Sequence, residues 1–247
     1  MASTPPYALF YWPTIPGRGE FVRLVFEEAG LPYVDVGRLP ESQGGGRAAI
    51  LRMLEEMGTG TPPFAPPILR HGDLRIAQTA LICRYVAEQG GLLPATDAGR
   101  WHADQLMMTI MDMVVEAHDI HHPIAKSLYY DEQKTESLRR AQSFRQERLP
   151  KALGYFERVL AQNESGGWLV GDRVSYVDLA LHHYVAGLRY AVPVRVAALA
   201  PNVPRVMALH EAVAKRPRIA AYLASPRRIP FNEHGIFRHY AELDGAE

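Results

Sequence analysis

In the first 90 residues, short apolar or alternating runs typical of strands are interleaved with stretches in which apolar residues recur at helical spacing, which predicts a mixture of strands and helices. The apolar run YALFY (7–11) is typical of a buried strand, and YVDV (33–36) alternates as a second strand does. Between them, residues 18–29 carry apolar side chains at helical spacing, and Gly30 and Pro32 follow as helix-stopping residues. This β-α-β order favours a parallel pair of strands.

A hairpin and a second helix are predicted next. The runs ILR (68–70) and LRI (74–76) flank His71-Gly72-Asp73, which is typical of two antiparallel strands joined by a tight turn. Residues 79–89 then show an amphipathic helical pattern that ends at two glycines.

Beyond residue 97 the pattern is helical, and no segment alternates convincingly as a strand does. The helical stretches are 101–119, 135–162, 175–190 and 203–224. Because residues 90–97 are rich in Gly and Pro, we expect a domain boundary there. We therefore predict two domains, residues 1–90 and residues 98–247.

Composition and charge narrow the class of protein. Hydrophobic residues make up 47% and charged residues 22% of the chain, as in ordinary globular proteins. Lys+Arg and Asp+Glu both total 27, which disfavours a nucleic-acid partner. The single cysteine, Cys83, forms no intramolecular disulfide and no C-x-x-C pair, and we expect it to be a small core residue.

The expected location is cytoplasmic. A lone thiol fits a reducing compartment, and the start MASTPPYALFYW lacks the basic and long apolar regions of a secretory signal. No uncharged apolar run approaches the roughly 18 residues of a membrane span, so we expect no membrane partner.

The loop between the first strand and the first helix invites a nucleotide-binding interpretation, since it holds Gly17-Arg18-Gly19. A dinucleotide-binding turn needs G-x-G-x-x-G, and Val22 stands where the third glycine would be. A P-loop needs Gly-Lys-Ser/Thr, which the loop lacks. Pro13 and Pro16 also remove amide donors that a phosphate would use. The residues therefore disfavour a nucleotide.

A second feature predicts a peptide site instead. Pro66-Pro67 stands directly before an apolar strand, where a cis peptide bond would let a bound peptide pair alongside. Gln78-Thr79 stands at the start of the following helix, whose free N–H groups and dipole favour a carboxylate. Together these segments predict a site for a short acidic peptide.

Four motifs in order resemble those of the cytosolic glutathione transferases, most closely the tyrosine-type group that includes the alpha, mu, pi and sigma classes. They are YWPTIPGRGEFVRLVFEEAGLPY (11–33), PPILRHGDLRIAQTALICRYVA (66–87), WLVGDRVSYVDLAL (168–181) and AKRPRIAAYLAS (214–225). The resemblance covers nearly the whole chain. It implies an α/β thioredoxin-like N-terminal domain, an all-α helical C-terminal domain and a homodimer. In the third motif, SYVD (175–178) also reads as a capping box, so we expect Ser175 and Asp178 to be structural.

The resemblance implies an enzyme that conjugates its co-substrate, glutathione, to hydrophobic electrophiles. Tyr11 matches the family's catalytic tyrosine, and its O–H would favour the thiolate because a hydrogen bond to a charged acceptor contributes about 1.5–3 kcal/mol. Arg18 matches an arginine close to the thiol. The alternatives are that Tyr11 is only a strand-end aromatic, which the residue taken alone favours, and that Arg18 is a solvated first-turn arginine.

The implied glutathione-binding residues are Pro66, Pro67, Gln78, Thr79 and Asp112, with Arg47 and Arg52 as candidates for holding the glycyl carboxylate. Gln78 and Thr79 would hold the γ-glutamyl end, although ordinary helix capping by Thr79 is an alternative. Asp112 would reach the partner subunit's glutathione, or be a solvated helix carboxylate. Pro66 departs from the family because it has no N–H, so either one hydrogen bond is lost or the register differs.

The implied electrophile pocket contains Trp12, Thr14, His118 and His122. His118, His121 and His122 stand at i, i+3 and i+4, which invites a metal interpretation. The spacing lacks the glutamate of H-E-x-x-H and an acidic ligand, so we expect no metal. We expect imidazoles there to make the pocket polar and to change charge near pH of about 6.5. A solvated or core cluster is the alternative.

Two other functions are compatible with the same residues. One is a glutathione-dependent isomerase or peroxidase of the same fold, and the other is a non-catalytic binding protein. Assays with an aryl halide, a hydroperoxide and an isomerisable substrate would separate them.

Overall fold

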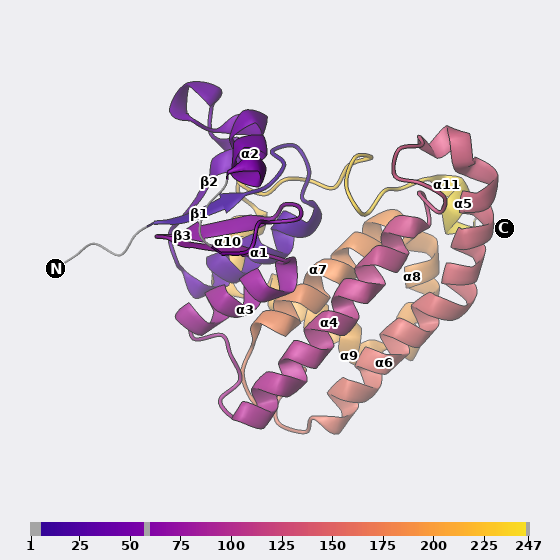
Figure 1. The fold of residues 1–247 in the computed structure, drawn as a ribbon. Helices are drawn as coiled ribbons and strands as arrows, with labels where there is room; N and C mark the ends of the chain where they lie inside the picture. Colours follow the sequence, from indigo (N-terminus) through magenta and orange to yellow (C-terminus); the bar gives the residue numbers. More distant parts are fainter. Residues whose placement is uncertain (1–5, 57–59, 246–247) are drawn as a thin grey trace.

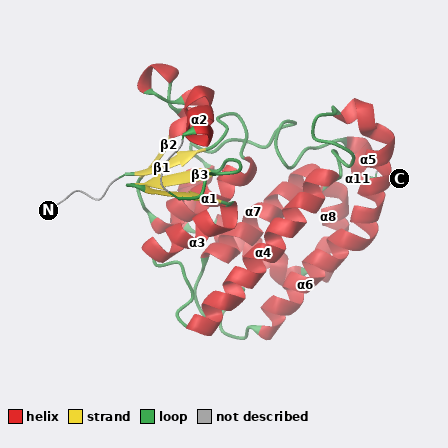
Figure 2. Cartoon of the chain, in the orientation of Figure 1, coloured by secondary structure: helices red, strands yellow, loops and turns green. Residues whose placement is uncertain are grey.

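The computed structural model describes residues 6–56 and 60–245 (Figure 1). A four-stranded sheet has the order β2-β1-β3-β4, with β1 parallel to β2 and the other two pairings antiparallel. The strands are β1 (Tyr7–Phe10), β2 (Tyr33–Asp35), β3 (Ile68–His71) and β4 (Leu74–Ala77). The predicted parallel pair and the predicted hairpin are therefore both present, at one end of the molecule (Figure 2).

Helices cover both faces of this sheet. The period of two along β1 sends Tyr7 and Leu9 into a core shared with α1 (Gly17–Ala29) and α3 (Thr79–Gln89). Ala8 and Phe10 point to the other face, into a smaller core under α2 (Gly46–Glu55). The predicted helix 79–89 matches α3, and Gly30 ends α1 in the left-handed conformation, with φ of 67°.

The rest of the described chain is helical. Its helices are α4 (Asp97–Asp119), α5 (Lys134–Ser143), α6 (Leu149–Gln162), α7 (Tyr176–Ala191), α8 (Pro193–Leu199), α9 (Pro204–Ala214), α10 (Pro217–Leu223) and α11 (Ala241–Asp244). They pack on one another and on α1 and α3, so the main core runs through both halves of the molecule. None of the helices in the described ranges is long and apolar enough to cross a lipid bilayer.

Two predicted helices are wrong in detail, and proline is the reason in both cases. The stretch 135–162 is α5 and α6 joined by a π-helical segment, Phe144–Arg148, because Pro150 lacks the N–H of a regular helical turn. The stretch 203–224 is α9 and α10, separated before Pro217. The stretch between the second strand and the hairpin was expected to be irregular, and this is wrong, because it contains helix α2. The helices α8 and α11 lie in segments for which the pattern gave no prediction.

The capping box predicted at 175–178 is confirmed. Asp178 accepts hydrogen bonds from the Ser175 amide at 2.7 Å and the Ser175 hydroxyl at 2.8 Å, and its other oxygen accepts from the Leu169 amide at 2.7 Å. The carboxylate is fully buried and joins the start of α7 to the loop before it. Its role is structural.

A buried polar cluster joins the two halves. Glu20 and Arg23 of α1 are fully buried, and Arg23 bonds Asp35 at 2.7 Å and Glu20 at 3.3 Å. Tyr222 of α10 donates to Glu20 at 2.9 Å, and Arg228 lies 3.2 Å from the same carboxylate. The cluster therefore fixes α1 against the end of the helical half.

The C-terminal segment, residues 224–240, returns from α10 over the loop between β1 and α1 (Figure 1). The Asn232 side-chain amide donates to the Thr14 carbonyl at 2.9 Å. Phe231 and Phe237 pack on the His183 ring of α7, with ring centroids 5.6 and 5.9 Å away. This segment therefore closes one side of the region that follows β1.

Candidate functional site

Tyr11 directly follows β1, and its ring lies against the first turn of α1. The side chain is 4% exposed. A Cβ on Gly17 would lie 2.2 Å from the Tyr11 hydroxyl, and a Cβ on Gly19 would lie 2.5 Å from the ring carbon Cδ1. Gly17 also has φ of +46°, which L side chains rarely adopt. The two glycines of the loop therefore make room for a tyrosine ring.

The Tyr11 hydroxyl caps helix α1. It accepts a hydrogen bond from the Arg18 backbone N–H at 2.8 Å, while the N-cap residue Pro16 makes no side-chain capping bond. Because its oxygen is the acceptor in that bond, the hydroxyl retains its own proton for a ligand. Burial raises the pKa of Tyr11, and the Arg18 N–H and the Arg23 charge only partly oppose this. The phenol thus stays protonated, as a hydrogen-bond donor must.

Two guanidinium groups lie near the Tyr11 ring and hydroxyl. The Arg18 guanidinium extends toward α4, where it lies 3.5 Å from the Met111 sulfur. Burial lowers the pKa of Arg18 from a very high ordinary value, so the group remains a cation at neutral pH. The Arg23 guanidinium carbon lies 5.8 Å from the centroid of the Tyr11 ring. Since Arg23 is already paired with Asp35 and Glu20, an anion at the Tyr11 hydroxyl would mainly meet the Arg18 guanidinium and the positive end of α1.

The sheet register brings three of the predicted segments together. Phe10 pairs with Ile68, and Ile68 pairs with Ala77. The neighbouring residues therefore lie at the same end of three adjacent strands: Tyr11 follows β1, Gln78 follows β4, and Pro67 precedes the antiparallel β3. The peptide bond between Pro66 and Pro67 is cis, as expected at this position.

Gln78 has an unusual backbone. Its φ of 71° is the one positive value for a residue other than glycine in the described parts of the chain. Such conformations cost about 1–3 kcal/mol and concentrate at functional sites. Gln78 is the N-cap of α3 and makes no side-chain capping bond, and Thr79 is the first residue inside the helix. The capping alternative for Thr79 thus has no support in this geometry, and the first-turn amides of α3 remain available to a carboxylate.

The two candidate arginines on α2 differ in position. The exposed Arg47 side chain lies over the Trp12 ring, with its guanidinium carbon 5.7 Å from the ring centroid. Trp12 is the residue after Tyr11, so Arg47 lies on the side of the site. Arg52 donates to the Gly44 carbonyl at 3.5 Å and lines a cavity on the α2 face of the sheet, together with residues such as Ala8 and Phe10. Arg47 is therefore the better placed of the two.

The residues predicted for the electrophile pocket lie around the C-terminal segment. Trp12 is half-buried, and Thr14 is exposed with its carbonyl bonded to that segment. His118 is on α4, seven residues after Met111 and so on the same helix face as that neighbour of Arg18. Asp112 is exposed on another face of α4.

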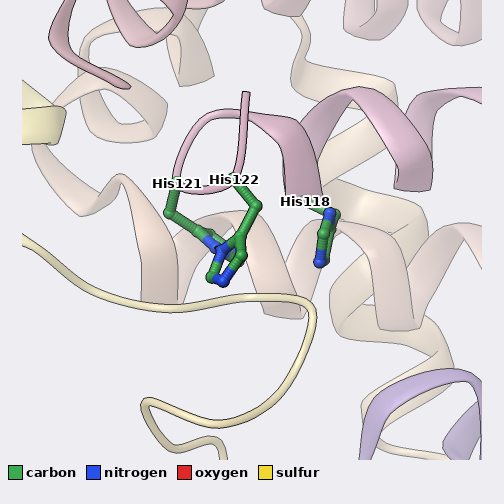
Figure 3. Close-up of side chains that lie close together, drawn as sticks. All are labelled: His118, His121 and His122. Carbon is green, nitrogen blue, oxygen red and sulfur yellow. The ribbon is translucent and has the colours of Figure 1, made fainter. Parts of the chain in front are cut away.

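The three histidines converge, although α4 ends at Asp119 and places His121 and His122 in the turn that follows (Figure 3). Their ring centroids are 4.8–5.2 Å apart. The expected charge change near neutral pH is wrong, because burial lowers the pKa of His118, lowers that of His122 to about 4 and lowers that of His121 to about 2. Nearby positive charge from Arg238 acts in the same direction.

One large cavity does not coincide with Tyr11. It measures about 840 Å³ and lies at the N-terminal end of α4, lined by residues such as Gly99, Trp168 and Arg216. The donors and charges described above converge instead at the edge of the sheet. We assign the site there because chemistry, not volume, identifies it.

Sequence reasoning missed two contributors to this region. Met111 contacts Arg18, but in the sequence it is one apolar residue among many in a long helix. The C-terminal segment has no helical or strand pattern, so nothing in the sequence placed it over residue 14.

Comparisons with known proteins agree with this geometry. A family model described as "Glutathione S-transferase, C-terminal domain" matches residues 118–226. The glutathione S-transferase of Plasmodium falciparum (isolate 3D7) is 25% identical over 215 residues, which cover 85% of this chain and 91% of that protein. Glutathione S-transferase P 1 of Xenopus laevis is 28% identical over 228 residues, which cover 91% of this chain and 94% of that protein.

A solved structure supports the fold. Prostaglandin synthase D of Nilaparvata lugens superposes with a TM-score of 0.70 and 18% sequence identity, covering 92% of this chain and 100% of that one. At this identity the likeness concerns the fold alone.

Proposed function

The chain belongs to the glutathione transferase family, and we propose that it adds the glutathione thiolate to hydrophobic electrophiles, with Tyr11 as the hydrogen-bond donor to sulfur. The predicted family, fold class and enzyme class are confirmed by its relatives. The assignment of individual residues is our proposal. One observation carries it: the Tyr11 hydroxyl caps α1 through Arg18 and retains its own proton at the edge of the sheet.

The chemistry follows from where the proton lies. The free thiol has a pKa of about 8.5, so only a small fraction is thiolate at neutral pH. The Tyr11 O–H donates to the sulfur, the thiol proton leaves to water, and the charges of Arg18 and Arg23 favour the anion. With an aryl halide, the thiolate forms the S–C bond and the halide leaves. Tyr11 itself is not deprotonated, because burial raises its pKa.

The tripeptide lies along the end of β3. The Pro66 carbonyl accepts a hydrogen bond from the amide of the tripeptide's cysteine. Pro66 has no N–H, so it donates no hydrogen bond to the carbonyl of that cysteine. Gln78, Thr79 and the first-turn amides of α3 receive the γ-glutamyl carboxylate. Arg47 receives the glycyl carboxylate. Residues 1–90 thus form the glutathione-binding domain.

The electrophile lies between the two halves. Trp12 and Thr14 border it from the loop after β1, and Met111 borders it from α4. Residues 98–247 supply the rest, including the C-terminal segment. His118 and His122 border the far end of this region, as neutral groups at neutral pH.

The outward face of α4 supports a homodimer. Its exposed residues Trp101, Gln105, Met108, Asp112 and Val115 follow a 4-3-4-3 spacing, which places them on one stripe. Trp101 is 73% exposed, and Leu81 on the neighbouring helix α3 is also exposed. Exposed apolar side chains that gather on one face, here Trp101, Met108 and Val115, are typical of protein interfaces. A second copy of the chain packed there would bring Asp112 of one subunit toward the glutathione of the other. The cytoplasmic location predicted from composition stays a prediction.

A sedimentation experiment tests the dimer. We expect the wild-type chain to be dimeric at micromolar concentration and Met108→Glu to be monomeric, because a charge would be buried in the interface. Lys151→Glu is a matched control, because it introduces the same residue at an exposed position on α6. An active wild-type monomer at micromolar concentration contradicts this arrangement.

Activity is tested by three parallel assays with glutathione: an aryl halide, a hydroperoxide and an isomerisable substrate. We expect conjugation to be the fastest, and we expect the ultraviolet absorbance of thiolate to rise when glutathione binds. Absence of both signals would leave only a non-catalytic role. A faster reaction with the hydroperoxide or the isomerisable substrate would favour the corresponding alternative.

A further inference from the structure

The histidines at the end of α4 have hydrogen bonds that fix their ring tautomers. His121 Nε2 lies 2.8 Å from the Ile236 carbonyl, which only accepts, so Nε2 carries the proton and Nδ1 has a free lone pair. His118 Nδ1 lies 3.1 Å from the Asp119 carboxylate, so in the same way Nδ1 donates and Nε2 is free. Two of the three imidazoles thus already present an unprotonated nitrogen.

The third imidazole faces one of these lone pairs. His122 Nδ1 and His121 Nδ1 are 2.6 Å apart. Since His121 Nδ1 carries no proton, the proton between the two nitrogens must be carried by His122 Nδ1, unless a metal cation lies there instead. A potential ligand nitrogen from each of the three rings lies within 4.8 Å of the other two.

The size of the cluster fits a metal ion. Tetrahedral binding of imidazoles at about 2.0–2.1 Å puts their ring centroids about 5 Å apart and their ligand nitrogens about 3.3 Å apart. The observed centroid separations are 4.8, 4.9 and 5.2 Å. The closest pair, His121 Nδ1 and His122 Nδ1 at 2.6 Å, would have to separate to about 3.3 Å when the ion binds.

We propose that His118, His121 and His122 bind one divalent transition metal ion of the zinc class. Three neutral imidazoles with a fourth open position are a recurrent zinc ligand set, and imidazole also suits Cu²⁺ and Ni²⁺. Asp119 and the Ile236 carbonyl are the outer partners that hold His118 and His121 in the correct tautomers. The sequence-based expectation of no metal rested on the missing H-E-x-x-H glutamate, which a three-histidine site does not require.

The site has an entry path and an opposing charge. His122 lines a cavity of about 650 Å³ that also contains Lys126, Tyr130, Glu233 and Arg238. Water and small ligands can therefore reach the cluster from the His122 side. Arg238 donates to the Gly235 carbonyl at 3.0 Å and its positive charge opposes that of the metal. We therefore expect micromolar affinity, weaker than that of a closed structural zinc site.

Metal binding would also act on the C-terminal segment. Ile236 bonds His121, and Asn232 of the same segment bonds the Thr14 carbonyl in the loop after Tyr11. A metal that fixes His121 would fix this segment beside the electrophile region. The metal site does not depend on the proposed transferase activity.

The test is a titration of the untagged, full-length, chelator-treated chain with Zn²⁺, without glutathione because its thiol binds zinc. Calorimetry should give one ion per chain, and Co²⁺ should produce the visible absorption of a tetrahedral site. His118→Ala and His122→Ala should each weaken binding by at least about 100-fold, and Asp119→Asn by about 10–100-fold. His102→Ala, which changes an exposed histidine at the other end of the same helix, should bind like the wild type.

Wild-type protein that fails to bind one equivalent of Zn²⁺ at micromolar concentrations would overturn the proposal. Unchanged binding in the His118 and His122 variants would overturn it as well. A crystal grown with Zn²⁺ gives a readout that needs no variant. The anomalous peak should lie among the three rings, and a peak elsewhere would refute the site.

Discussion

Removing the Tyr11 hydroxyl tests the proposed catalytic step most directly. In Tyr11→Phe the ring should stay in place, because Gly17 and Gly19 enclose it from α1. Two interactions are lost: the donor to sulfur and the acceptor for the Arg18 N–H. The first affects the thiol and the second affects the end of α1, so they have separate readouts.

The size of the catalytic effect follows from one hydrogen bond. A bond to a charged acceptor contributes about 1.5–3 kcal/mol, and about 1.4 kcal/mol corresponds to one pKa unit. The pKa of bound glutathione should therefore rise by roughly 1–2 units, and turnover at neutral pH should fall between about ten-fold and about a hundred-fold. Glutathione affinity should change only a few-fold, because other residues hold the peptide.

The assay is the pH dependence of thiolate absorbance and of turnover with an aryl halide. Because burial raises the pKa of Tyr11, the rising limb of the profile reports the glutathione thiol, and the two enzymes should converge at alkaline pH. Tyr7→Phe is the matched control, since it removes the same oxygen from a buried tyrosine of β1 whose ring stacks 4.0 Å from His71 of the neighbouring strand β3. Unchanged turnover of Tyr11→Phe at neutral pH would refute the assignment, as would an equal loss in Tyr7→Phe.

Three further changes probe the neighbouring structure. Gly19→Ala places a methyl group 2.5 Å from the Tyr11 ring, so it should lower the free energy of unfolding by about 1–3 kcal/mol and reduce turnover. As a control, Gly154→Ala should be neutral or stabilising, because the nearest neighbour of its new methyl group is 3.7 Å away. Equal unfolding midpoints for the two variants would contradict this. Pro66→Val restores an N–H and should tighten glutathione binding by about two- to ten-fold in calorimetry, and unchanged affinity would argue against that contact. His182 is buried against His210 and near Arg228, which lowers its pKa to about 3. In the unfolded chain His182 is protonated near pH of about 6.5, so the free energy of unfolding should fall by about 2 kcal/mol between about pH 7 and pH 5 because of this residue. In urea unfolding, the free energy of unfolding of His182→Gln should fall by about 2 kcal/mol less than that of the wild type over the same pH range.

Local patterns predicted the part of the fold that depends on short stretches of chain. The start and end of α3 match residues 79–89 because Gly90 and the apolar stripe are local signals. The continuity of 203–224 failed because one proline at 217 outweighs the periodicity on both sides of it. Burial of Glu20 and Arg23 was not predicted, because charges on an amphipathic helix ordinarily face solvent.

For the site, the sequence predicted which residues come together but not the pKa values of the histidines. Tyr11, Pro67 and Gln78 carry motif signals and stand next to residues in register, so the sheet brings them together. The low pKa values of the histidines depend on their burial in the folded chain and on Arg238, which lies more than a hundred residues away in the sequence. Tertiary desolvation of this kind has no local signature.

The glycine loop after β1 shows how one backbone arrangement serves two chemistries. A strand followed by glycines and a helix start presents unpaired amides and a positive dipole, which is why the same pattern binds phosphates. Here the Arg18 amide binds the Tyr11 hydroxyl, and the glycines accommodate its ring. The helix end then acts on an anion through the phenol, because a hydroxyl that accepts one hydrogen bond becomes a stronger donor in the next. The loop that resembles a phosphate cradle is therefore suited to a sulfur anion, with the tyrosine between the amide and the charge.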